Sequence, residues 1–168
     1  AAQKATSDKK LPPVHLWNPE FCGDIEMRIR RDGSWDYMGT PISRKRMVKL
    51  FSTILRRDDD DYFLVTPVEK VGIRVDDAPF TAVEMEKDDE HIIFRTNVDD
   101  FVTVDKDHPI RMEINQKTGE PSPYVRVRDR LEALITRNVY YQLADLAVEH
   151  DGAYGVWSGD VFFTLDRE

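Results

Sequence analysis

A short amphipathic pattern preceded by a hydroxyl residue occurs twice in the chain. In the first copy, ISRKRMVKLFSTILRR (residues 42–57), apolar residues recur three, four, seven and eight positions apart, which is typical of a helix with one buried face. The second copy, ITRNVYYQLADLAVEH (residues 135–150), repeats this spacing without a gap. Ser43 and Thr136 precede the two patterns, and their residue types commonly cap helices. The sequence therefore predicts two equivalent helices and a fold built from two copies of one unit.

Alternating apolar and charged residues before each predicted helix indicate strands. Residues 25–29 and 110–114 share the pattern Ile-x-Met-x-Ile, as expected of a strand with one solvated face. Each is followed by a turn and a return strand, and two further strands follow each predicted helix. Residues 80–109, between the two copies, read as antiparallel strands with polar turns. The strand pattern thus repeats along with the helix pattern.

These patterns together predict an α+β fold. It would consist of two β-β-α-β-β repeat units joined by an antiparallel β connector, with the helices packed on the sheets. We assign residues 1–10 to a disordered tail, 11–79 to the first unit with its lead-in, 80–109 to the connector and 110–168 to the second unit. Units of this size are too small to bury both faces of a sheet alone. We therefore expect the copies to pack together and to leave a seam, where ligands commonly bind.

Charge and composition argue against several classes of function, and nucleic-acid binding through the first predicted helix becomes the least favoured of them. The net charge of the 168 residues is −8, whereas extended nucleic-acid binding requires a positive surface. The apolar runs are too short to span a bilayer, which argues against a membrane partner. The single cysteine, Cys22, is expected to be a buried thiol; it excludes an intrachain disulfide and fits a cytoplasmic location. The sequence leaves open whether the protein forms an oligomer.

Catalytic and metal-binding spacings are missing from the sequence. The four histidines, His15, His91, His108 and His150, are scattered, and none has the spacing of a zinc site. No Gly-rich phosphate loop, nucleophile elbow or dinucleotide fingerprint occurs. We therefore predict no metal and no cofactor, and we favour a protein without catalytic activity. The alternative is a hydrolase whose Asp and His groups converge at the cleft between the repeats, with His108 beside a carboxylate.

Arginines on two strand faces form the preferred ligand-binding site. Tyr124, Arg126 and Arg128 alternate along one strand, and Arg95 and Asn97 lie in a similar pattern on a connector strand. Guanidinium groups bind carboxylates and phosphates in a bidentate way, so these faces could line a cleft for an anionic ligand. The same arginines could instead pair with nearby acidic side chains across the solvated face of a sheet.

Two further arginines occupy equivalent positions at the predicted helix starts. Arg44 opens a run of three cations in the first copy, and Arg137 occupies the matching position in the second. Cations at a helix N-terminus are slightly unfavourable unless something compensates them, and an anionic ligand or the acidic segment 76–109 could do so. We include both arginines in the predicted site, although they could also be simply solvated.

Most of the chain from residue 11 onward resembles a known bacterial family. The segments that carry the resemblance include WDYMGTPISRKRMVKLFSTILRR, YFLVTPVEKVGI, HPIRMEI, TGEPSPYVRVRDRLEALITR and YGVWSGDVFF, which are similar to the domain-of-unknown-function 1285 family. The resemblance implies an uncharacterised protein with an α+β fold of repeated units, no established activity and a role in signal transduction. Together with the residue patterns, it favours a cytoplasmic, non-catalytic module that binds a small anionic ligand or a protein partner.

Overall fold

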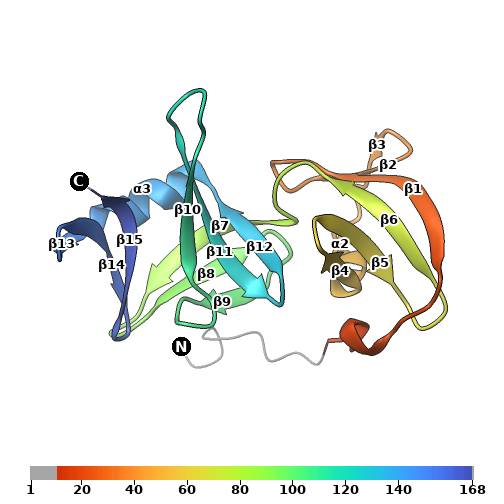
Figure 1. Ribbon diagram of the computed structural model, residues 1–168, viewed down its shortest axis with the longest axis horizontal. Helices are drawn as coiled ribbons and strands as arrows, with labels where there is room; N and C mark the ends of the chain where they lie inside the picture. The colour runs from red at the N-terminus through yellow and green to blue at the C-terminus, as the bar shows by residue number, and fades with distance from the viewer. Residues whose placement is uncertain (1–10, 168) are drawn as a thin grey trace. The chain divides into compact units, whose positions relative to one another are not determined.

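The computed structural model describes residues 11–167, and these residues form two compact units. The first unit ends at Pro79 and the second begins at Phe80. The predicted disordered tail, residues 1–10, lies outside the described residues. Strands are the main secondary structure of both units, so the fold is β-rich, and only two short α-helices interrupt the strands of the described chain (Figure 1).

The first unit is built around one six-stranded sheet with the order β3-β2-β1-β6-β5-β4. Strands β1 and β6 pair in parallel at its centre, and the outer strands pair antiparallel on either side. In chain order the elements are η1 (Val14–Leu16), β1 (Phe21–Ile29), β2 (Trp35–Tyr37), β3 (Thr40–Pro41), α2 (Lys45–Thr53), β4 (Leu55–Asp58), β5 (Asp61–Val65) and β6 (Lys70–Val75).

The second unit contains a six-stranded sheet and a three-stranded sheet. The larger sheet has the order β10-β11-β12-β7-β8-β9, and the smaller sheet has the order β13-β14-β15. The elements are β7 (Phe80–Lys87), β8 (Ile92–Thr96), β9 (Phe101–Thr103), β10 (Ile110–Ile114), β11 (Pro121–Arg128), β12 (Leu131–Ile135), α3 (Arg137–Asp145), β13 (Val148–His150), β14 (Ala153–Ser158) and β15 (Val161–Arg167).

The two six-stranded sheets repeat each other, but in a different phase from the one the sequence suggests. Each sheet consists of two three-stranded meanders whose first and last strands pair in parallel, β1 with β6 and β7 with β12. By this order β10 corresponds to the edge strand β4, and not to the central strand β1 whose Ile-x-Met-x-Ile pattern it shares. The residues predicted as a separate connector, 80–109, supply β7, β8 and β9 of the second sheet. Period-two alternation marks any half-buried strand and so cannot identify equivalent ones.

The two helices are shorter than predicted and occupy different places in the repeat. Helix α2 lies between the third and fourth strands of its sheet, whereas α3 follows the sixth strand. Both apolar patterns continue past the helix ends because the following residues enter strands: Leu55, 1% exposed, pairs with Leu64 in β5, and Val148 pairs with Gly155 in β14. A helix face and a buried strand cannot be distinguished over so few residues.

The helix starts agree only in part with the predicted caps. Thr136 is the N-cap of α3 as predicted, but Arg44, and not Ser43, is the N-cap of α2. Cys22 also departs from expectation, because its thiol is exposed at the start of β1. Phe21 beside it is 55% exposed, so this end of β1 is a surface segment.

Each unit has its own apolar core. In the first unit Ile29 and Trp35 are almost fully buried, and the Trp35 ring stacks on Phe51 of α2 with their centroids 6.2 Å apart. In the second unit Phe80 and Phe94 are fully buried. Burial of one such side chain contributes about 1.5–3 kcal/mol. Each unit can therefore position a site on its own framework.

Candidate functional site

An apolar pocket of about 530 Å³ lies between α2 and its sheet. Met47, Phe51 and Ile54 face it from the helix side, because residues four and three positions apart lie on one helix face. Ile25 and Met27 face it from β1, since alternate residues of a strand share one side of the sheet. The remaining lining residues are Tyr37, Ile42, Leu64, Thr66, Glu69 and Val71.

The pocket has the size and chemistry of a ligand site. Pockets that bind small molecules are usually about 300–1,000 Å³, mostly apolar, and carry few polar groups. Tyr37 and Met47 are 50% and 37% exposed, so the pocket is open to solvent at the side where they lie. Trp35 stacks behind Phe51, and its buried Nε1 has no hydrogen-bond partner among the described residues.

Two arginines flank the helix side of this pocket. Arg44 is three residues before Met47, and Arg46 is four residues before the exposed Leu50, so each lies one helical turn from an apolar side chain. Both side chains are exposed, and neither guanidinium group forms a hydrogen bond or ion pair with the residues that the structure describes. Glu69 is the acidic residue that lines the pocket, and it lies in the turn after β5. The end of β5 is next to the C-terminal end of α2, because the backbone N–H of Val65 donates to the carbonyl of Ile54. Positive charge and the Glu69 carboxylate therefore lie toward opposite ends of the helix.

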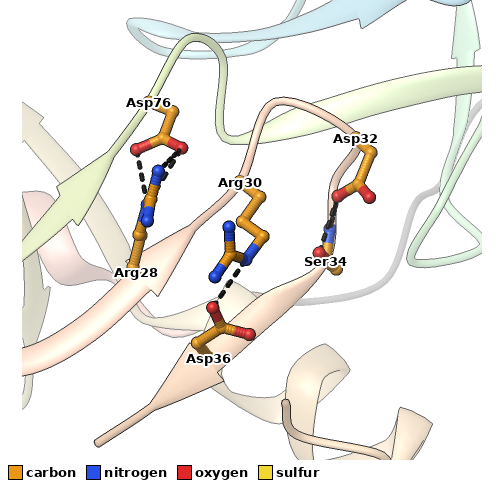
Figure 2. Close-up of polar contacts among 6 residues, drawn as sticks. All are labelled: Arg28, Arg30, Asp32, Ser34, Asp36 and Asp76. Atoms are coloured by element: carbon orange, nitrogen blue, oxygen red, sulfur yellow. Dashed lines mark hydrogen bonds and ion pairs between the residues drawn. The ribbon is translucent and has the colours of Figure 1, made fainter. Parts of the chain in front are cut away.

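The opposite face of the sheet carries charged side chains, most of which are paired (Figure 2). Arg28 of β1 donates from Nε and Nη2 to the Asp76 carboxylate at 2.8 and 2.6 Å, and Arg30 donates from Nε to Oδ2 of the buried Asp36 at 2.6 Å. The hydrogen bond from Arg28 holds the pKa of Asp76 below its ordinary value. The turn between β1 and β2 is closed by Asp32, which accepts hydrogen bonds from the Ser34 hydroxyl and N–H. These interactions satisfy the groups that would otherwise attract a ligand.

A wide polar groove of about 890 Å³ runs along this charged face. Asp24 lies over Gly72 of β6, where a Cβ would collide with the carboxylate. Lys70 lies over the Phe63 ring at 4.2 Å and pairs with Asp58 at 2.9 Å. Basic and acidic residues both line the groove, so it offers no strong preference for an anion.

Arg95 and Asn97 of the predicted site have structural partners. Arg95 pairs with Glu84 at 2.8 Å and with Asp99 at 2.7 Å, and the hydrogen bond to Glu84 raises the pKa of Arg95. Asn97 Oδ1 accepts a hydrogen bond from the Thr81 N–H at 3.0 Å. Arg95 therefore pairs with nearby carboxylates, which is the alternative to ligand binding given in the sequence analysis.

Tyr124, Arg126 and Arg128 of the predicted site do not share one open face. Tyr124 is only 5% exposed and lies under the Arg111 guanidinium, 4.7 Å away. A register shift between Arg126 and Arg128 breaks the alternation. Arg126 Nε donates to the Asp129 carbonyl at 2.5 Å.

The environment of Arg128 is more enclosed than that of Arg126. Arg128 lies over the Phe80 ring at 5.2 Å and pairs with Asp100 at 3.7 Å. Burial lowers the pKa of Arg128, although the Asp100 carboxylate opposes this effect. The fold thus brings Arg95 and Arg128 to neighbouring acidic residues, Asp99 and Asp100.

The remaining predicted residues, Arg44 and Arg137, belong to different units. Arg44 precedes α2 in the first unit, and Arg137 is the exposed first residue of α3 in the second. The pocket under α2 was missed by the sequence reasoning, which assigned its apolar lining to the core. The sequence did contain one signal of such a pocket: α2 has more apolar residues than the core buries, such as Leu50, which is 62% exposed.

Metal-binding and membrane-spanning features are not found in the described chain. Residues 11–167 contain no group of three or more His, Cys, Asp or Glu side chains that could hold a metal ion. Neither described α-helix is long and apolar enough to cross a bilayer. His108 does lie beside a carboxylate, with Nδ1 2.8 Å from Asp105 Oδ1. Asp105 Oδ1 also accepts hydrogen bonds from the backbone N–H groups of Asp107 and His108, so it closes the turn before β10.

Comparisons with known proteins confirm the family resemblance. Residues 12–78 match the model of the DUF1285 N-terminal domain, and residues 79–165 match the model of the DUF1285 C-terminal domain. A crystal structure of a DUF1285 family protein from Silicibacter pomeroyi DSS-3 is 53% identical, covers 99% of this chain and 93% of its own, and has a TM-score of 0.90. A second, from Shewanella baltica OS155, is 30% identical, covers 71% of this chain and 90% of its own, and has a TM-score of 0.58. No curated protein matches the chain.

Proposed function

The chain belongs to the DUF1285 family, whose function is unknown, and from this premise we propose that its first unit is a non-catalytic binding module. The module takes the apolar part of a small anionic ligand into the pocket under α2. The observation that carries this proposal is the apolar pocket of about 530 Å³, which is open at Tyr37 and Met47. We assign this binding to cytoplasmic signalling, as the family resemblance suggests.

The charge around the pocket favours an anion. Residues 41–57 contain six Lys and Arg residues and no Asp or Glu. Arg44 is adjacent in sequence to this pocket lining, since it falls between Ile42 and Met47. A carboxylate, sulfonate or phosphate at the N-terminal end of α2 would gain hydrogen bonds from the Arg44 guanidinium, which matches the geometry of such groups.

An aromatic sulfonate provides a direct test, because it combines an apolar body with an anionic group. We expect 1-anilinonaphthalene-8-sulfonate to bind the folded protein with a rise in its fluorescence. Met47→Glu places a carboxylate at the mouth of the pocket and should weaken the affinity about 10-fold, since burying an unpaired charge is costly. Ile114→Glu, at a residue 55% exposed in the second unit, is the matched control and should bind as the wild type does.

The three tryptophans allow the binding to be located. In a Trp17→Phe/Trp157→Phe background only Trp35 remains, and it stacks on the pocket residue Phe51. Energy transfer from Trp35 to the bound sulfonate should accompany the rise in fluorescence. Equal affinity of wild type and Met47→Glu, with both folded by circular dichroism, would contradict the proposal.

A hydrolase is the second candidate, and it rests on His108. Asp105 holds the imidazole through Nδ1 at 2.8 Å, an arrangement that orients a general base. Hydrolysis of p-nitrophenyl acetate or phosphate by the wild type, lost in His108→Ala but kept in His15→Ala, would support this candidate. No hydrolysis above that of the His108→Ala variant would count against it.

A further inference from the structure

We propose that the surface around the pocket docks an acidic segment of a partner protein that carries apolar anchor residues. We call this surface the α2 surface and define it by Tyr37, Met38, Arg44, Arg46, Met47 and Leu50. The inference rests on the proposed function in one respect, because the pocket under α2 receives an anchor side chain of the partner. It goes further by naming the occupant of the site.

The α2 surface exposes several large apolar side chains to solvent. Met38 and Leu50 are 63% and 62% exposed, and Tyr37 and Met47 are 50% and 37% exposed. Three of these residues are connected, because Tyr37 and Met47 line the same pocket and Leu50 lies one helical turn from Met47. Met38 is the next residue after Tyr37 in the sequence. Contiguous exposed apolar side chains bordered by charge are typical of protein interaction sites.

Its residue types are those that protein interfaces favour. Tyr, Met and Arg are enriched at interfaces and supply many of the residues that dominate binding energy. Three of the five methionines of the chain, Met27, Met38 and Met47, lie in or next to the pocket. Methionine side chains adapt to partners of different shape, so the α2 surface is suited to a helical segment with Leu-like anchors.

The charges on this surface select an acidic partner. The Arg44 and Arg46 side chains are exposed and form no hydrogen bond or ion pair with any residue in the described range, and α2 has no acidic residue in its first turn. The chain as a whole carries a net charge of −8, so positive charge here is a local feature. Complementary charge speeds association and excludes basic partners.

The concave shape favours a peptide over a lipid bilayer. An anionic bilayer would also attract Arg44 and Arg46, but it presents no side chain that would fill a pocket of about 530 Å³. An amphipathic helix places anchors at positions i, i+3, i+4 and i+7, and such anchors enter grooves of this kind. The structure therefore points to a helical, acidic segment.

Synthetic peptides and vesicles test the inference on the full chain. The probe is a fluorescently labelled peptide with Leu at positions i, i+3, i+4 and i+7 and Glu at most other positions. Two matched peptides replace either every Glu by Lys or every Leu by Ser. We expect the Glu–Leu peptide to bind, measured by fluorescence anisotropy, and both matched peptides to bind at least about 10-fold more weakly. Raising the salt concentration should weaken the Glu–Leu peptide's binding, because exposed charges are screened.

Variants of the protein locate the binding site. Arg44→Glu/Arg46→Glu should weaken peptide binding about 10-fold or more, and Leu50→Ser should weaken it severalfold. The matched control is Lys106→Glu/Lys117→Glu, which makes the same change of charge at two exposed residues of the second unit and should bind as the wild type does. Equal binding by the Arg44/Arg46 variant and the wild type would overturn the inference.

Two other results would assign the surface to something else. If vesicles of phosphatidylserine bind through Arg44 and Arg46 and no peptide does, the surface contacts lipid and the inference fails. If the aromatic sulfonate binds in the pocket but the Glu–Leu peptide does not, the proposed function stands and only the peptide inference fails. If neither binds, both fail.

Discussion

The Ser158 hydroxyl oxygen accepts a hydrogen bond at 2.9 Å from the backbone N–H of Ile92. Ser158 ends β14 in the three-stranded sheet, and Ile92 begins β8 in the six-stranded sheet. The same hydroxyl donates to the Val104 carbonyl at 2.6 Å, and Ser158 is 1% exposed. One buried side chain thus joins the two sheets of the second unit.

We expect Ser158→Ala to destabilise the protein by about 1–3 kcal/mol. The substitution leaves the Ile92 N–H and the Val104 carbonyl buried without this partner, and unsatisfied buried groups cost about this much. The free energy of unfolding in urea measures the effect. Ser43→Ala, at an exposed residue, is the control and should change stability by less than about 0.5 kcal/mol. Equal stability of the two variants would show that the hydrogen bonds of the Ser158 hydroxyl do not stabilise the contact between the sheets.

Alanine should have different effects at two glycines in strands. At Gly155 a Cβ would collide with the carbonyl oxygen of Phe163, which is backbone and cannot rotate away. At Gly72 the nearest atom is an oxygen of the Asp24 side chain, which can turn aside. We expect Gly155→Ala to cost about 1–3 kcal/mol and Gly72→Ala less than about 1 kcal/mol, partly offset by lower entropy of the unfolded chain. Thermal unfolding of both variants checks this order, and the reverse order would refute it.

Asp58 should stabilise the folded protein at neutral pH and lose this effect at acidic pH. Burial opposes ionisation, but hydrogen bonds from Arg56 and Lys70 outweigh it and lower the pKa of Asp58. A carboxyl whose pKa is lower in the folded state stabilises the fold above its unfolded pKa of about 3.9, and this contribution is lost as the pH falls through the folded value.

The corresponding test uses Asp58→Asn. Because the Asp58 side chain is 37% exposed, solvent screening limits the expected loss to about 1 kcal/mol at pH 7. The loss should shrink between pH 4 and pH 2, as followed by urea unfolding at several pH values. A loss that is the same at pH 7 and pH 2 would contradict the assigned ion pairs.

Arg56 should hold the segment before β1 in place. Its Nη1 donates to the carbonyls of Val14 and Trp17 at 2.8 and 2.7 Å, and its side chain is only 15% exposed. We expect Arg56→Met to free η1, so that the amides of Leu16 and Trp17 exchange with deuterium faster. Arg57→Met, whose wild-type side chain bonds within its own turn, should leave that exchange unchanged.

Local patterns predicted many of the elements correctly. The Asp-Gly turn between β1 and β2 was visible in the sequence, and Gly33 there has a φ of 91°, which glycine adopts readily. Strand β12 was missed, although Leu131, Ala133 and Ile135 are buried and alternate with more exposed residues.

The predicted site depended on relations that local patterns do not contain. The alternation of Tyr124, Arg126 and Arg128 was visible, but the register shift that separates Arg126 from Arg128 was not. The partners of Arg95, which are Glu84 and Asp99, are set by strand pairing and by a turn. A charged side chain's availability depends on such neighbours, and these are known only once the strands are placed.

The sequence by itself determined the family, many of the strands and, to within one residue, the start of each helix, because these depend on residue types and spacings within a few positions. Only the tertiary structure decided that β1 pairs with β6 and β7 with β12, and that α2 leaves an apolar pocket over its sheet. Parallel pairing joins residues distant in the chain, and a pocket is the volume that packed side chains fail to fill. Neither is encoded in the period of any single segment.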